Sequence, residues 1–254
     1  MRDFARALLL GLALGCFAHP ASATPPDIVD VRDELFGISR TSLFLLRTTR
    51  DNLGLHTSEH RDVVLVAIER STGKESLWPV YRARNVSDEG RGARGDAQKT
   101  VVRMPANAVD PYAKLRDAEG YPVGPGDGFD AGRMSVKIEG GILTISDAEG
   151  EIARREVSSI LTDVTASLDR LADAIGDYGR LAPIRTRDLI GGQTFQADQC
   201  KASDPFAYDD RSGAPPIRIV RLTCQEQEGQ TTSLLMPIPA KGAASGANAG
   251  GARP

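Results

Sequence analysis

The chain has 254 residues, of which 41% are hydrophobic and 26% are charged, and its net charge is −3 at pH 7. This length can bury a substantial core as one large domain or as two small ones. The slightly acidic balance argues against a general nucleic-acid-binding protein.

The N-terminal residues have the pattern of a secretory signal peptide. Arg2 precedes a short apolar run at residues 7–17, and small residues follow up to Ala23. The run is shorter than the roughly 20 apolar residues that a membrane-spanning helix needs. We therefore expect residues 1–23 to be removed, Thr24 to become the new terminus, and the protein to be exported to the periplasm or secreted. No later run in the sequence is apolar enough to span a membrane.

An alternative cleavage site lies within the same segment. Residues 12–16, Leu-Ala-Leu-Gly-Cys, resemble a bacterial lipobox, with Gly15 and Cys16 in their places. Ala13 stands where such boxes usually carry Leu. Cleavage before Cys16 would leave a lipid-anchored structural envelope protein, and this alternative stays open.

Two cysteines, Cys200 and Cys224, remain after the leader. An exported protein with two cysteines most simply joins them in a disulfide. The bridge would close a loop of roughly 25 residues and add roughly 3.5 kcal/mol of stability on the chain-entropy model.

Apolar runs separated by turn residues predict a succession of short strands. Residues 24–32 read as a lead-in, and residues 107–116 are expected to hold a helical turn. Pro79 removes a ladder hydrogen bond, so its strand should lie at an edge or bend there. After Cys200 we expect a polar loop to Pro216. The expected strands cover residues 42–48, 63–68, 77–81, 99–104, 134–138, 142–145, 151–154, a weak one at 193–197, 217–224 and 232–236.

Residues 157–178 have the clearest helical period in the chain. Apolar residues recur in steps of four and three, which places one stripe along one face of a helix. Ile160 and Ala172 widen the stripe, which favours packing on a sheet over the narrow seam of a coiled coil. A homodimer through this helix is the alternative, because three heptads are the lower limit for such a seam.

A run of strands, one helix and further strands indicates an α+β fold. We expect mostly antiparallel β hairpins in a meander, packed with one long amphipathic helix at residues 157–178. Residues 24–239 should form a single domain, with an alternative boundary near residues 117–132. Residues 240–254 are Gly- and Ala-rich without an apolar stripe, so we expect a disordered tail.

The stretch His56-Thr57-Ser58-Glu59-His60 matches the H-x-x-E-H motif. It is similar to the motif of inverzincin metalloproteases, in which two histidines on one helical turn bind zinc and the glutamate activates water. The resemblance implies a zinc hydrolase that uses His56, Glu59 and His60. The mature chain has no third histidine, so a carboxylate or a cysteine would have to complete the site.

Other motifs favour ordinary structure over chemistry. Residues 71–74 match S-x-x-K, but a β-turn explains them, because the companion motifs of penicillin-recognising enzymes are missing. The chain has no phosphate-binding glycine loop. A basic patch reads as a solvated face rather than a nucleic-acid site, because acids are interspersed and aromatics are few. Its members are Arg82, Arg84, Arg91, Arg94 and Arg103.

The sequence thus predicts an exported, disulfide-stabilised, non-catalytic binding or envelope-accessory protein. Its ligand would be an unknown protein or small molecule, and no cofactor is implied. Two alternatives remain, a zinc hydrolase that uses residues 56–60 and an envelope protein anchored at Cys16.

Overall fold

The computed structural model of the chain describes residues 29–52, 58–86, 99–123, 134–175, 190–208, 217–225 and 230–238. The predictions for residues 1–23, Cys16, His56 and residues 240–254 fall outside these ranges. The bounds of the predicted domain stay a prediction for the same reason.

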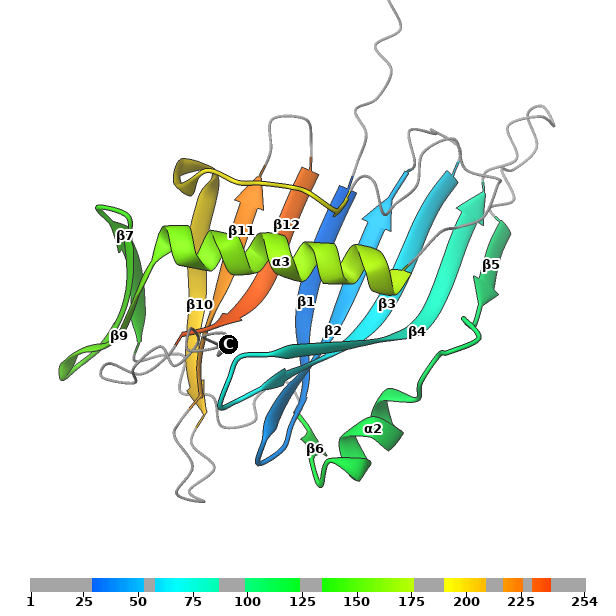
Figure 1. The fold of residues 1–254 in the computed structure, drawn as a ribbon, viewed down its shortest axis with the longest axis horizontal. Coiled ribbons are helices and arrows are strands. Elements are labelled where there is room, and N and C mark those ends of the chain that lie inside the picture. The colour runs from blue at the N-terminus through cyan, green and yellow to red at the C-terminus, as the bar shows by residue number, and fades with distance from the viewer. Residues whose placement is uncertain are drawn as a thin grey trace, which may run out of the picture.

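One large sheet of nine strands dominates the structure (Figure 1). Its order is β10-β11-β12-β1-β2-β3-β4-β5, and the short strand β6 pairs with β1. The strands are β1 (Val29–Ile38), β2 (Ser42–Asp51), β3 (Ser58–Glu69), β4 (Glu75–Val86), β5 (Lys99–Arg103), β6 (Tyr121–Pro122), β10 (Cys200–Tyr208), β11 (Ile217–Gln225) and β12 (Gln230–Pro237).

The large sheet is mostly antiparallel, as predicted, but it is mixed and does not form a simple meander. Strand β12 pairs parallel with β1, with Val31 opposite Thr232, whereas the other pairs are antiparallel. The last strand described therefore lies beside the first strand described, and this long-range pairing leaves no local signal in the sequence.

Helix α3 (Val157–Ile175) crosses one face of the large sheet (Figure 1). It begins at the predicted residue, while its predicted end at residue 178 lies outside the described ranges. A three-stranded antiparallel sheet of β7 (Ser135–Glu139), β8 (Ile142–Asp147) and β9 (Gly150–Glu156) leads into it and lies beside β10. The buried residues of α3 are Val157, Ile160, Val164, Ser167, Leu168, Leu171, Ala172 and Ile175.

These side chains face the sheet. All of them except Ser167 and Ala172 join a core cluster with residues such as Leu45 and Val66, so the apolar stripe is already covered within one chain. The wide stripe that includes Ile160 is what a helix packed on a sheet requires. No helix in the described ranges is long and apolar enough to cross a membrane.

A second, shorter helix lies on the opposite face, which we call the outer face. Helix α2 (Pro111–Asp117) confirms the expected helical turn and begins at Asp110, whose side chain accepts from the Tyr112 amide. Its buried Leu115 packs with Phe44 and Leu65 of the sheet. The outer face is thus covered near the β1–β2 turn and carries no helix near β5 in the described ranges (Figure 1).

Three strands were not predicted, and one of them is the two-residue strand β6. Strand β1 lies in the expected lead-in, and its alternation of apolar residues is interrupted by Asp33, which is fully buried. Strand β10 lies in the expected polar loop, where the sheet register shifts between Ser203 and Phe206. No strand is found at residues 193–197, and a 3-10 turn (Ala197–Gln199) precedes β10 instead.

Pro79 has the predicted effect on its strand. The register of β3 and β4 shifts between Val63 and Val64, where Val64 stands opposite Pro79. Pairing of β4 with β5 starts only at Arg82. The proline therefore lies at a bulge, and no described strand pairs with it on the side of β5. A strand tolerates a missing backbone hydrogen-bond donor at such a position.

Candidate functional site

A network of charged side chains lies buried between α3 and the large sheet. Arg47 on β2 and Asp33 on β1 are fully buried and stand opposite each other. Arg47 Nε donates to Asp33 Oδ1 at 2.6 Å, and Arg47 Nη2 donates to Asp33 Oδ2 at 2.9 Å. This bidentate pair reaches the helix, because Arg47 Nη1 donates to Ser167 Oγ at 2.5 Å.

Glu75 on β4 completes this network. Its carboxylate accepts from Ser167 at 2.7 Å and from Arg170 at 2.8 Å. Burial raises the pKa of Glu75, but the charge of Arg47 and the hydrogen bonds from Arg170 and Ser167 outweigh it and hold the pKa below its usual range. Burial likewise opposes the charge of Arg47, but Asp33 and Glu75 raise its pKa. Two cations compensate two acids, so we assign the network a structural role in holding α3 on the sheet.

Two further rows of polar side chains follow on the same face, beyond the network. Thr49, Asp51, His60 and Asp62 are each at most 4% exposed. The register of β2 to β5 aligns one row of Thr49, Asp62, Arg82 and Arg103, and a second row of Asp51, His60, Arg84 and Val101.

Arg82 ties these rows to the helix. Its Nε donates to Asp62 Oδ1 at 2.7 Å, and its Nη2 donates to the carbonyl oxygen of Ile175 in α3 at 2.7 Å. A cation on the last carbonyls of a helix complements the negative end of the helix dipole. Arg82 therefore joins β4, β3 and α3.

Burial perturbs two titratable groups in these rows. It lowers the pKa of His60 to about 4, with the charges of Arg84 and Arg82 acting in the same direction. It also raises the pKa of Asp62, against the hydrogen bond and charge of Arg82. His60 is therefore neutral at pH 7, and protonating it must oppose the folded state.

The predicted zinc ligands do not share one helical turn. Glu59 and His60 lie on strand β3, where neighbouring side chains point to opposite faces. Glu59 pairs with Arg50 at 2.9 Å on the outer face, whereas His60 is buried on the α3 face. Within the described residues, no group of three or more His, Cys, Asp or Glu side chains could hold a metal ion. His56 lies outside these residues, so its part in the motif stays a prediction.

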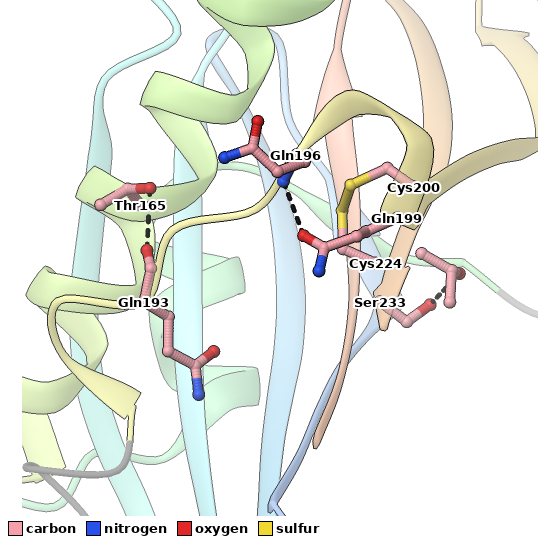
Figure 2. The surroundings of a disulfide bond; sticks show 8 residues. Thr165, Gln193, Gln196, Gln199, Cys200, Cys224 and Ser233 are labelled. Atoms are coloured by element: carbon pink, nitrogen blue, oxygen red, sulfur yellow. Dashed lines mark hydrogen bonds between the residues drawn. A yellow bond between two sulfur atoms is a disulfide. The ribbon is translucent and has the colours of Figure 1, made fainter. Parts of the chain in front are cut away.

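The structure contains the predicted disulfide between Cys200 and Cys224 (Figure 2). The two residues are direct partners across β10 and β11, with their Cα atoms 4.1 Å apart. Thr165 of α3 donates to the carbonyl oxygen of Gln193 at 3.0 Å on the segment that leads into β10. The disulfide and this contact fasten the far end of the sheet to the helix.

A pocket opens on the outer face, at the other end of the sheet. Its volume is about 550 Å³, and β3, β4 and β5 provide its walls. Val102 and Met104 are 60% and 65% exposed, two of the four large apolar side chains in the described residues with such exposure. The lining residues are Arg61, Tyr81, Ala83, Thr100, Val102 and Met104.

Sequence reasoning did not find this pocket. Arg61, Ala83 and Val102 meet because they occupy one row of the β3–β4–β5 register. The expectation of a solvated basic face is wrong for Arg82, whose side chain is only 21% exposed and paired with Asp62. It holds for Arg103, which is exposed.

No protein-family model, no curated protein and no solved structure matches the chain.

Proposed function

We propose that the protein is an exported binding protein without chemistry of its own, which takes its ligand in the outer-face pocket. The exposed apolar pair Val102 and Met104 beside Tyr81 supports this proposal most directly. Apolar walls with one cation are suited to holding a ligand.

Export is supported by two features that are independent of each other. The signal-peptide pattern at residues 1–23 directs secretion. The Cys200–Cys224 bridge is the kind of crosslink that persists in oxidising compartments. The presence of both a leader and a disulfide favours the periplasm or the exterior over the cytosol.

The exported protein should begin at Thr24 and contain no bound metal. Its mass should be lower than that of the reduced chain by two hydrogens, because the two cysteines form a disulfide. Intact mass spectrometry under native and denaturing conditions measures this directly. A diacylglycerol adduct on Cys16 would instead establish the anchored alternative. One zinc per chain under native conditions would contradict a metal-free binding protein and would favour a zinc hydrolase that uses residues 56–60.

The pocket should bind anilinonaphthalene sulfonate, an apolar anion, with enhanced dye fluorescence. A variant with Val102→Ser and Met104→Gln should bind the dye roughly thirtyfold more weakly, because it loses two apolar contacts of about 1 kcal/mol each. Tyr112→Ser is the matched control, since Tyr112 is 62% exposed on α2, away from the pocket. Fluorescence titration of the three proteins gives the affinities. Equal dye binding by all three would contradict a ligand site in the pocket.

A further inference from the structure

Among the described strands, β5 is at the edge of the large sheet. No described strand pairs with the edge of β5 that points away from β4, and β5 is the outermost strand at the right of Figure 1. The opposite edge, β10, lies against β7 of the small sheet. An exposed edge offers a row of backbone donors and acceptors to any extended chain.

The two faces at this edge differ in chemistry. Along β5, with the sequence KTVVR, successive side chains alternate between the α3 face and the outer face. Val102, together with Met104 just beyond the strand, lines the pocket on the outer face. Arg103 is on the α3 face, in register with Arg82.

The α3 face at this edge carries two arginines, Arg84 and Arg103, and Asp51 lies in the same row as Arg84. Arg84 has a buried Nε without a hydrogen-bond partner in the described part of the chain. Its register partner is Val101 on β5, one row from Arg103. Neither β5 nor β4 from Arg82 onwards contains an acidic residue.

We propose that β5 accepts an extended peptide segment of another protein, in which acidic and apolar residues alternate. Added as a further strand, the segment would direct its acidic side chains towards Arg103 and Arg84. Its apolar side chains would lie beside Val102 and Met104 at the pocket. The alternation of a strand matches the two different faces of the edge, which is the source of specificity in strand addition. The proposal rests on the pocket of the proposed function and names its partner.

A second copy of the chain suits this edge poorly. Antiparallel pairing of two β5 strands about Val101 would place Arg103 of each copy opposite Lys99 of the other. Like charges directly opposite each other destabilise a strand pair. The same cations attract an acidic strand.

The test uses the full exported protein and three fluorescein-labelled nonapeptides. The first alternates Glu and Val, the second alternates Lys and Val, and the third is the Glu/Val peptide N-methylated at four consecutive residues. Fluorescence anisotropy should show saturable binding of the first peptide at one per chain. The second and third peptides should bind at least about tenfold more weakly, because one has the wrong charge and the other cannot pair through its backbone.

Two protein variants complete the test. Arg103→Glu should weaken Glu/Val peptide binding by at least about tenfold, since it places an acid beside the acidic strand. Arg116→Glu, the same charge change on exposed α2, should leave binding unchanged. Hydrogen exchange should show new protection of the β5 amides when the Glu/Val peptide is bound.

Each other outcome overturns the inference. If the Lys/Val peptide bound as tightly as the Glu/Val peptide, recognition by charge would be excluded. If the N-methylated peptide bound as tightly, pairing through the backbone would be excluded. A concentration-dependent dimer with already protected β5 amides would assign the edge to a second copy. If dye binding depends on Val102 and Met104 but no peptide binds, the peptide partner is rejected. The proposed ligand site in the pocket is then still supported. Loss of both would reject the proposed function as well.

Discussion

Replacing Arg47 by Met is expected to lower the free energy of unfolding by about 3–5 kcal/mol, because it leaves buried acids without their cation. Asp33 is fully buried and would keep only the amide of Leu235, which donates to Asp33 Oδ2 at 3.1 Å. Glu75 would keep Ser167 and Arg170. Urea unfolding at pH 7, followed by circular dichroism, measures the loss.

Arg32→Met is the matched control for Arg47→Met. Arg32 and Glu34 are 3.8 Å apart with both side chains 66% exposed, so the loss should stay within about 0.5 kcal/mol. The double variant Arg47→Met with Asp33→Leu should recover part of the stability, since no unpaired carboxylate remains at Asp33. If Arg47→Met cost no more than Arg32→Met, the buried network could not be what holds α3 on the sheet.

This network also explains where the sequence misled the fold prediction. A charged residue in an alternating strand indicates a solvent-facing position, so Asp33 concealed β1 as a strand of the core. The partner that makes burial tolerable is Arg47, 14 residues away on the next strand. Strand β3 was predictable because residues 63–68 are apolar at every position. Helix α3 was predictable because its apolar residues recur with a helical period.

The candidate site was less predictable than the fold. Its lining residues come from three strands and form no motif, and the shift in strand register beside Pro79 decides which of them align. The strongest local motif, at residues 56–60, was read with the helical spacing of a metal site. Strand β3 places Glu59 and His60 on opposite faces instead. The disulfide was predictable because two cysteines allow one pairing.

His60 should make the protein lose about 2 kcal/mol of stability as the pH falls from 7 to 5. The pKa of His60 is about 4 in the folded protein, against an ordinary value of 6.5. Between these values the unfolded chain binds a proton that the folded protein does not, so stability rises with pH in this window. The titratable and charged groups near His60 are Asp51, Asp62, Arg82 and Arg84.

The effect of His60 can be separated from that of the acids. Glu75, with its lowered pKa, contributes stability that is lost only below its ordinary value of 4.5. Asp62 has a raised pKa, so its protonation acts in the opposite direction to that of His60. The difference in unfolding free energy between the wild type and His60→Gln, measured by urea at steps from pH 7 to 5, isolates the histidine. Because His60 is the only histidine among the described residues, parallel curves for the two proteins would mean that its imidazole is not buried in the neutral form.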